Sequence, residues 1–407
     1  MKVALLTNVF FPVVNGVVHS IHLLSKGLVR HGLKVSVVSS KHPKFNFELL
    51  SKYQINYNLI KLNSIYFPKV DYCIPNPLTL KQEVKKIDVE PNIIQINHPF
   101  IIFKMAKMLK KYNENSKVVF IYHTQYEQYY HYFKLMPKFL YERFLYNHLK
   151  EVFSFVDTVI FPSLSIKKSV EEKFDKFSRK FIFISNPVDL DHMENYSEKK
   201  VIELRKKYNL EGCFVLGFVG RLEKEKNLCK LLEFFREFLD FFRLSNPDGK
   251  VKLILVGGGS EYNNLVKYAG LLNIMDYVVF TDKVPYDEIP NYFRLIDVFV
   301  SFSLTEVKPL SYLESLSAKV PIISFKTFGA DDLIIDGYNG YLIEYNDNYK
   351  KNFIHTIYEL YKSKELLSTL KENAYNSSKN YHYLNISKKY MDVYYDLTRE
   401  SRNPVFK

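Results

Sequence analysis

Residues 298–314, VFVSFSLTEVKPLSYLE, combine a short apolar run, a loop with two acids and the start of a helix. Val298–Ser301 is a short apolar run of the kind found in strands that are buried on both faces. Pro309, Leu310 and Ser311 then predict the start of a helix, because a proline in the first helical turn gives up no hydrogen bond. A buried strand that leads through a loop into a helix is the repeating unit of a doubly wound α/β sheet.

The same stretch also predicts a ligand site. Free N–H groups and the positive end of the helix dipole at Pro309, Leu310 and Ser311 favour an anion such as a diphosphate. Glu314, about one turn further on, is placed to accept hydroxyls of a ribose, and Glu306 is placed to do the same for a sugar. The pattern fits a nucleotide-sugar; the alternative is a loop-to-helix junction with two solvated acids.

The strand–helix alternation extends through both halves of the chain. Short β-branched runs predict these strands: Val3–Leu6, Val35–Val38, Ile93–Ile96, Val118–Ile121, Thr158–Phe161, Val215–Val219, Leu253–Val256, Val278–Phe280, Val298–Ser301 and Ile322–Phe325. Helical spacing is found in Val17–Arg30, Phe100–Lys111, Pro137–Phe155 and Tyr383–Glu400. This rhythm predicts two open, parallel, doubly wound sheets, whose ligands bind beyond the carboxyl ends of the strands.

A chain of 407 residues is too long for one ordinary core. We expect an N-terminal domain over residues 1–185, a second domain over 186–380, and a C-terminal helical segment over 381–407 that packs back toward the first. The three cysteines lack CxxC spacing, which argues against disulfides or a zinc site and for a reducing compartment. No long apolar segment follows a basic start, so neither a signal peptide nor a transmembrane helix is indicated.

The net charge of +13 is distributed unevenly. Residues 1–185 carry 27 Lys and Arg against 13 Asp and Glu, whereas residues 186–407 carry 30 against 31. A basic first domain suggests an anionic partner, either a membrane or a nucleic acid. The alternative explanation for the total net charge is compositional bias. The counts of 32 Tyr, 33 Phe and no Trp suggest an A/T-biased genome, which also favours Lys. Because no nucleic-acid-binding motif is visible, we expect no nucleic-acid partner.

Two further loops carry groups suited to a ligand. Gly220 is followed by Arg221 and Lys226, two cations that can clamp a diphosphate on the turn after a buried strand, unless this is only a lysine-rich exposed turn. The glycines at 257–259 are not accompanied by the lysine of a phosphate-binding loop, so we expect them to have a structural role near the nucleotide. Gly16, in the loop after the first strand, allows a close backbone approach or forms an ordinary turn.

His123 ends a predicted strand and opens an aromatic segment. Its place at a sheet edge predicts contact with a sugar or an acceptor hydroxyl, although a lone histidine is often structural. Tyr126, Tyr129 and Tyr130 follow it and offer ring platforms for a sugar or a lipid, or a contribution to the core. Phe139, Leu140 and Phe144, on the next predicted helix, offer apolar side chains for partial membrane insertion or for the core.

Taken together, these segments resemble the retaining GT-B glycosyltransferases of family 4 over nearly the whole chain. The E-x7-E motif of that family corresponds to Glu306 and Glu314, and its GRL-x-x-EK stretch to Gly220, Arg221, Leu222, Glu225 and Lys226. The N-terminal P-x-x-NGV loop is matched from Pro12 to Val17, the HT-x-Y segment from His123 to Tyr126, and the Asn-x-Val-Asp turn from Asn186 to Asp189. The five matches occur in the order of the family.

The resemblance implies a nucleotide-sugar donor held by the second domain, an acceptor held by the first, retention at the anomeric carbon, and no metal. Within the family, the chain is most similar to bacterial enzymes that put glucose or galactose on diacylglycerol or a sterol. The implied site comprises the donor residues Gly16, Gly220, Arg221, Lys226, Glu306, Pro309, Leu310, Ser311 and Glu314, and the sugar or acceptor contact His123; of these, we predict His123, Arg221, Lys226 and Glu306 to be catalytic. We add Lys308 as a donor-binding candidate, which could supply a third cation or crowd the loop. Lys308 occupies a position where the family usually has glycine. This difference leaves the identity of the donor open.

We therefore predict a membrane-lipid hexosyltransferase with a UDP-glucose or UDP-galactose donor, peripheral on the cytosolic face of an anionic membrane. The acceptor and membrane candidates are Tyr126, Tyr129, Tyr130, Phe139 and Phe144. Two alternatives remain within the class: a transferase that extends a polyprenyl-linked or soluble glycan, and a GT-B nucleotide-sugar epimerase. A nucleic-acid-binding protein is the alternative outside enzymes.

Overall fold

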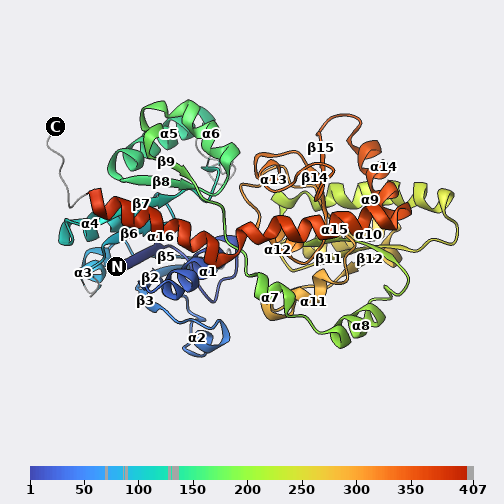
Figure 1. Ribbon diagram of the computed structural model, residues 1–407, viewed down its shortest axis with the longest axis horizontal. Helices are drawn as coiled ribbons and strands as arrows, with labels where there is room; N and C mark the ends of the chain where they lie inside the picture. The colour runs from blue at the N-terminus through green and yellow to red at the C-terminus, as the bar shows by residue number, and fades with distance from the viewer. Residues whose placement is uncertain (69–71, 86, 88–89, 127–129, 131–136, 401–407) are drawn as a thin grey trace. The chain divides into compact units, whose positions relative to one another are not determined.

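The computed structural model describes residues 1–68, 72–85, 87, 90–126, 130 and 137–400 (Figure 1). The chain forms two compact units. The first comprises Met1–Pro187 and the final segment from Tyr381, and the second comprises Val188–Asn380. The predicted boundary at residue 186 therefore lies two residues before the observed one.

The first unit is built on a seven-stranded parallel sheet with the order β3-β2-β1-β6-β7-β8-β9. The strands are β1 (Lys2–Thr7), β2 (Lys34–Ser40), β3 (Asn58–Leu62), β6 (Ile93–Ile96), β7 (Lys117–Ile121), β8 (Thr158–Phe161) and β9 (Phe181–Phe183). The central strands are buried along almost their whole length, as their apolar sequences require. The strand order reverses between β1 and β6, which makes their carboxyl ends the expected ligand edge.

Helices cover this sheet, and a short antiparallel hairpin lies beside it (Figure 1). The helices are α1 (Gly16–Arg30), α2 (Glu48–Lys52), α3 (Leu80–Lys85), α4 (Ile101–Tyr112), α5 (Lys138–Phe155), α6 (Leu164–Lys173) and α16 (Tyr383–Glu400), and the hairpin is β4 (Ser64–Phe67) with β5 (Tyr72–Pro75). The sequence did not predict β3, β9 or the hairpin. β9 is very short, and the others mix polar with apolar residues in a way that does not distinguish them from loops.

The C-terminal helix α16 packs against α1 within this unit. The contact is close at Gly27, where a Cβ atom would lie 2.3 Å from Ser387 Oγ and 3.0 Å from the carbonyl oxygen of Tyr383. Ile386, Tyr390 and Tyr394 of α16 belong to the same core cluster as the apolar face of α1. Helix α16 is thus part of the first unit's core.

The second unit contains a six-stranded parallel sheet with the order β12-β11-β10-β13-β14-β15. Its strands are β10 (Phe214–Val219), β11 (Val251–Val256), β12 (Val278–Phe280), β13 (Val298–Ser301), β14 (Ile322–Phe325) and β15 (Gly340–Ile343). Its helices are α7 (Leu190–Glu194), α8 (Glu198–Lys207), α9 (Leu228–Ser245), α10 (Tyr262–Leu271), α11 (Ile289–Phe293), α12 (Leu310–Ser317), α13 (Phe328–Asp331), α14 (Tyr349–Lys362) and α15 (Lys364–Ser378). The predicted pair of doubly wound parallel sheets is confirmed.

One local prediction needs correction. Pro309 is not in the first turn of a helix: with φ −69° and ψ 127° it is the extended residue that precedes α12, which begins at Leu310. The proline still loses no hydrogen bond, because an N–H at this position has no partner inside the helix. Within the described ranges, no helix is both long and apolar enough to span a membrane. The three cysteines are free thiols.

The close contact at Gly27 predicts a packing defect on substitution. Gly27→Ala should lower the unfolding free energy by about 1–3 kcal/mol, because the added methyl group overpacks the α1–α16 contact. Urea unfolding of the full chain measures the loss. Ser387→Gly removes the clashing atoms, so Gly27→Ala should cost less in that background. Equal costs in both backgrounds would contradict this account of the contact.

Candidate functional site

The switch point of the second sheet lies between β10 and β13. The loop at residues 220–227 leaves β10, and the loop at residues 302–309 leaves β13. Two hydrogen bonds join the loops: Asn227 Nδ2 donates to the carbonyl oxygen of Phe302 at 3.1 Å, and Ser303 Oγ donates to that of Glu225 at 3.2 Å. Asn227 adopts the left-handed conformation, φ 56°, that directs the chain from this loop into α9.

An ion pair between these loops brings two predicted site residues together. Lys226 Nζ lies 2.6 Å from Glu306 Oε1. The side chains are 20% and 12% exposed, so each charge is largely removed from water and depends on the other. The sequence predicted both residues for the site but not this contact. A ligand that binds here contacts an ion pair whose two charges balance and of which only a small part is exposed.

Arg221 has a different environment. Its Nη2 atom lies 3.2 Å from Glu225 Oε1, and the Arg221 side chain is 57% exposed. An exposed ion pair of this kind contributes about 0–1 kcal/mol to stability. A bound anion can therefore replace Glu225 as the partner of the guanidinium with little loss of free energy. Arg221 is therefore the more available of the two predicted diphosphate cations.

The glycines of the neighbouring loop make a close backbone contact with Gly220–Leu222. A Cβ atom at Gly257 would lie 2.1 Å from the carbonyl oxygen of Gly220, and one at Gly259 would lie 2.3 Å from that of Leu222. Leu222 N donates to the carbonyl oxygen of Gly258 at 3.0 Å. Only residues without a side chain allow this approach, and the result is a fixed path for the loop that carries Arg221.

The start of α12 presents backbone donors rather than a surface cation. No side chain caps this helix, and the N–H groups of Leu310 and Ser311 have no hydrogen-bond partner within the part of the chain that is described. Lys308 is buried instead of pointing out beside them. Its Nζ lies 3.4 Å from the carbonyl oxygen of Asp332, and burial lowers its pKa to about 8. The Lys308 side chain thus ties the loop to the end of α13.

Glu314 lies on α12, one turn beyond those donors. Burial raises the pKa of its carboxyl group to about 7, so the group titrates near neutral pH. The pKa of Tyr286 is raised first by the burial of its own hydroxyl and then by the negative charge of Glu314. The two side chains therefore lie near each other. A partly buried carboxyl group with this pKa is a candidate for binding a hydroxyl-rich ligand.

In the first unit, Gly16 is the first residue of α1. Asn15 caps the helix, since its side-chain oxygen accepts from Val18 N at 3.0 Å. Lys61 Nζ holds the preceding loop by donating to the carbonyl oxygen of Phe11 at 3.1 Å. Burial lowers the pKa of Lys61 to about 7, so this amine is a structural donor more than a surface charge.

His123 lies just beyond β7, with Nε2 3.1 Å from Asn97 Oδ1. Burial, and then the nearby His98, lower its pKa to about 3, so the ring is neutral at physiological pH. His98 lies beyond β6, with Nε2 3.2 Å from Thr7 Oγ1, and burial lowers its pKa to about 4. Asn97 and His98 were not predicted from the sequence, although they directly follow a predicted strand.

The aromatic candidates of the first unit fall into three groups. Tyr126 is buried, its ring lies 5.5 Å from that of Tyr122, and its carbonyl oxygen accepts from Tyr141 Oη at 2.6 Å. The Tyr130 ring lies 5.7 Å from that of Tyr141. Phe139 and Phe144 are 67% and 50% exposed in the first two turns of α5. Tyr129 lies outside the described residues.

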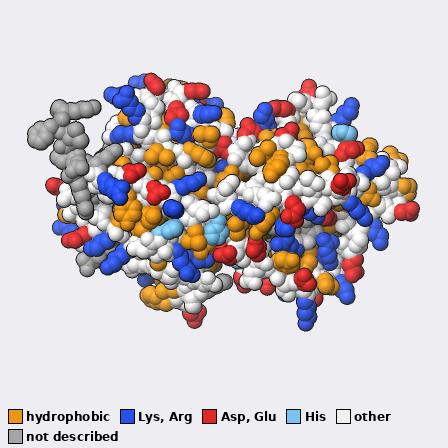
Figure 2. Space-filling model, viewed as in Figure 1, with side chains coloured by type: hydrophobic (Ala, Val, Ile, Leu, Met, Phe, Trp, Pro, Cys, Tyr) orange, Lys and Arg blue, Asp and Glu red, His pale blue; other side chains and the backbone are white. Residues whose placement is uncertain are grey.

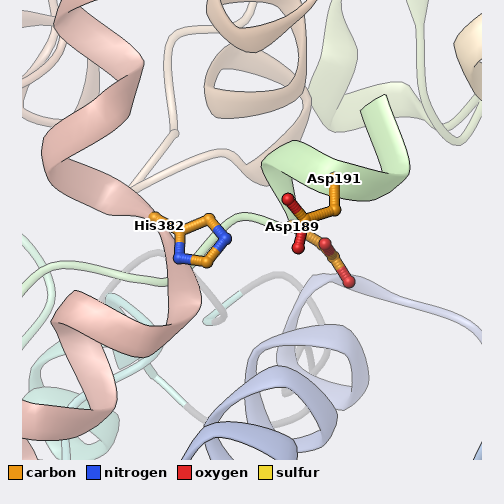
Figure 3. A group of neighbouring side chains, drawn as sticks. All are labelled: Asp189, Asp191 and His382. Atoms are coloured by element: carbon orange, nitrogen blue, oxygen red, sulfur yellow. The ribbon is translucent and has the colours of Figure 1, made fainter. Parts of the chain in front are cut away.

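Figure 3 shows Asp189 and Asp191 at the start of α7, together with His382. Asp189 has a structural role as the cap of α7, where Oδ1 accepts from His192 N at 3.2 Å. The aspartates belong to the second unit and His382 to the first. The expectation that no metal is needed stays a prediction.

Two family models match the chain: Glycosyltransferase Family 4 over residues 14–192 and Glycosyl transferases group 1 over residues 200–377. The alpha-monoglucosyldiacylglycerol synthase of Acholeplasma laidlawii is 26% identical over 392 residues, which cover 94% of this chain and 93% of that protein. The synthase of the same name from Streptococcus pneumoniae is 27% identical over 349 residues, covering 83% and 74%.

Among solved structures, Anabaena HepE in complex with UDP and glucose has a TM-score of 0.74 at 17% identity and covers 97% of this chain and 100% of its own. That likeness shows the fold alone. The matched ranges lie almost entirely in the first and in the second unit, respectively, and they contain His123, Arg221, Lys226, Glu306 and Glu314. The chain therefore belongs to the GT-B glycosyltransferases of group 1 and family 4, and it is a hexosyltransferase.

Proposed function

We propose that this enzyme moves a hexose from UDP-glucose or UDP-galactose to a membrane lipid such as diacylglycerol or a sterol, with retention at the anomeric carbon. The observation that carries the donor side is the Lys226–Glu306 ion pair at the β10–β13 switch point, beside the exposed Arg221 and the open start of α12. The lipid acceptor is supported by the names of the two relatives, both alpha-monoglucosyldiacylglycerol synthases.

On this proposal, the second unit binds the donor through its diphosphate. The N–H groups at Leu310 and Ser311, with Arg221 and Lys226, receive the negative charge that grows on the nucleoside diphosphate as the glycosidic bond breaks. Glu314 accepts ribose hydroxyls, and Glu306 accepts a hydroxyl of the transferred sugar while it holds Lys226. Because these cations balance the leaving charge, we propose that no metal ion is required.

The first unit, on the same proposal, binds the acceptor and meets the membrane. Phe139, Leu140 and Phe144 are 67%, 43% and 50% exposed at the start of α5, which offers apolar side chains for partial insertion. In the view of Figure 2, Lys and Arg side chains on this unit are interspersed with acidic and uncharged ones. Attachment through such a surface is peripheral and reversible, and we propose that it occurs at the cytosolic face of the cell membrane.

A turnover screen tests the proposal directly. UDP-glucose and UDP-galactose are each offered with diacylglycerol and with a sterol in mixed micelles, and NMR reads the anomeric linkage of the product. We expect an α-linked glycolipid from one of the donors, since both donors are α-linked and the configuration is retained. Transfer only to a soluble or polyprenyl-linked glycan, or interconversion of the two donors without transfer, would replace this function with one of the alternatives.

Removing the available cation should impair the chemical step. Arg221→Ala should lower kcat by about 10²-fold, because the leaving diphosphate loses a preorganised charge partner. Glu225→Gln, which removes the exposed partner of Arg221 but keeps the guanidinium, is the matched control and should leave kcat within a few-fold of wild type. Activity of the wild-type enzyme should survive EDTA. A strict requirement for added Mg²⁺ or Mn²⁺ would contradict the assigned role of the cations.

Glu314 should make UDP binding depend on pH. Its raised pKa of about 7 means that the carboxylate, the form that accepts two hydroxyls, is lost as pH falls from 8 to 6. Calorimetry should therefore show weaker UDP binding at pH 6 than at pH 8, beyond the change in Glu314→Gln, which controls for the titration of UDP itself.

Glu314 should also shape the pH dependence of stability. The folded carboxyl group has a pKa above its unfolded value of 4.5, so the folded state binds more protons between those values. Its contribution to stability is then present at low pH and lost as pH rises through 7. Glu314→Gln should consequently be more stable than wild type at pH 8, and relatively less so at pH 5. A stability difference between the two proteins that does not change with pH would show that Glu314 does not titrate in this range.

The exposed start of α5 should control membrane binding. If four or five cations face an anionic bilayer, at about 1 kcal/mol each they supply ~4–5 kcal/mol. Vesicle cosedimentation should strengthen with phosphatidylglycerol content and weaken with salt, and Phe139→Ser with Phe144→Ser should reduce it further. Phe241→Ser, an exposed phenylalanine of the second unit, is the control and should have no effect. Equal binding to neutral and anionic vesicles at all salt concentrations would contradict the proposal.

A further inference from the structure

A line of buried polar side chains runs through the first unit to His123. The hydroxyl of Tyr394, on α16, donates to Gln95 Oε1. Gln95 Nε2 donates to Asn97 Oδ1 at 3.1 Å, and the same oxygen lies 3.1 Å from His123 Nε2. Tyr394, Gln95 and Asn97 are fully buried, so their polar atoms depend on one another.

The donors and acceptors in this line fix the proton on His123. Asn97 Nδ2 donates to the carbonyl oxygen of Leu6 at 3.1 Å, so the amide oxygen is the atom that faces Gln95 and His123. An amide oxygen only accepts, and therefore the Nε2 atom of His123 carries the hydrogen. Because burial keeps this ring neutral, its Nδ1 atom is unprotonated and can accept a hydrogen bond.

His98 is fixed in the same tautomer by an independent partner. The single hydrogen of the Thr7 hydroxyl goes to the carbonyl oxygen of Val9 at 3.0 Å, so Thr7 Oγ1 accepts from His98 Nε2 at 3.2 Å. Burial keeps this ring neutral as well, which leaves His98 Nδ1 unprotonated. Thr7 itself is fully buried at the end of β1.

The two histidines lie at neighbouring positions on one edge of the sheet. β6 and β7 pair with Ile96 opposite Phe120, so His98 and His123 both lie just past the carboxyl ends of adjacent strands. Both side chains are partly exposed. Neither Nδ1 atom has a hydrogen-bond partner among the residues that the structure describes. Two neutral acceptors thus occur together at the expected ligand edge of the first sheet.

We propose that His98 joins His123, which the family resemblance already implies as a sugar or acceptor contact, in a hydroxyl-binding pair whose two Nδ1 atoms accept hydrogen bonds from hydroxyl groups of a substrate. Tyr394, Gln95 and Asn97 position His123, and Thr7 positions His98. The pair fits a neutral polyol, either the transferred sugar or the glycerol of the acceptor, and it disfavours a phosphate, whose oxygens have no hydrogen to donate. This inference rests on the proposed function for the identity of the substrate, whereas the tautomers do not depend on it.

Nitrogen NMR of the full-length enzyme with ¹⁵N-labelled histidine tests the tautomers, because protonated and unprotonated imidazole nitrogens resonate far apart. His98→Gln and His123→Gln assign the two rings. We expect the Nε2–H form for both rings. A ring that is Nδ1–H, or that averages between the two forms, would overturn the assignment for that residue.

Matched variants test the positioning residues. Tyr394→Phe removes the donor to Gln95, so the His123 signals should move toward a mixture of tautomers while those of His98 stay. Thr7→Val should have the converse effect. Tyr390→Phe removes a hydroxyl from the same buried face of α16 and keeps the ring that packs against Tyr394, with 6.2 Å between ring centroids. Among the described residues no hydrogen bond joins this hydroxyl to the line, so the variant should change the signals of neither histidine. If Tyr390→Phe and Tyr394→Phe give the same spectrum, the line does not position His123.

Titration and kinetics identify the hydroxyl source. UDP-glucose, UDP-galactose and diacylglycerol micelles are added separately, and both Nδ1 signals should shift with a donor or with the lipid, but not with UDP alone. His98→Leu should raise KM for that same substrate about 2- to 10-fold, the scale of one lost hydrogen bond. Correct tautomers with no response to any of these probes would overturn the binding role. Absence of turnover with intact tautomers and shifts would instead count against the proposed lipid acceptor.

Discussion

The parallel pairing of β10 with β13 is the constraint on which the charged site of the second unit depends. Leu216 pairs with Val298 and Gly217 with Phe299, so the loops after the two strands begin about one strand spacing, ~5 Å, apart. Glycine at 217 leaves room for the side chain of Ile296, just before β13, since a Cβ atom at 217 would lie 2.4 Å from it. Lys226 and Glu306, 80 positions apart in the sequence, meet as a result.

The two ion pairs of these loops serve different purposes because they differ in burial. The Lys226–Glu306 pair is largely shielded, so loss of one partner leaves an isolated charge that water reaches poorly, at a cost of up to about 3–5 kcal/mol in fully buried cases. The Arg221–Glu225 pair is open to solvent and is easily exchanged for a ligand. One pair fixes the geometry of the loops, and the other offers a cation.

The corresponding edge of the first sheet has the opposite electrostatic character. His98 and His123 are neutral there, and Lys61, the buried amine that holds the neighbouring loop, has a lowered pKa. The excess of positive charge in residues 1–185 therefore belongs to the surface rather than to this edge. An edge with neutral acceptors suits hydroxyl groups, whereas an edge with cations suits a diphosphate, and the two sheets divide these chemistries between them.

Elements whose character is local were predictable from the amino-acid sequence. Central strands such as Ile93–Ile96 and Val298–Ser301 are short, mostly apolar and buried throughout, and the structure has them at the predicted bounds. Arg221, Lys226, Glu306 and Glu314 were also recognisable, because their order and spacing along the chain match a family motif. Edge strands such as β3 and β15 were not predicted, because they are only partly buried and their sequences show no clear hydrophobic periodicity.

The partners and the charge states of the polar residues, by contrast, follow from tertiary packing. The order of the strands brings Lys226 to Glu306, the packing of α16 on α1 brings Tyr394 to Gln95, 299 positions away, and the loop at α13 buries Lys308. The raised pKa of Glu314 and the lowered pKa values of His98 and His123 are consequences of burial. Burial and long-range contacts depend on which elements pack together, and no short stretch of sequence contains that information.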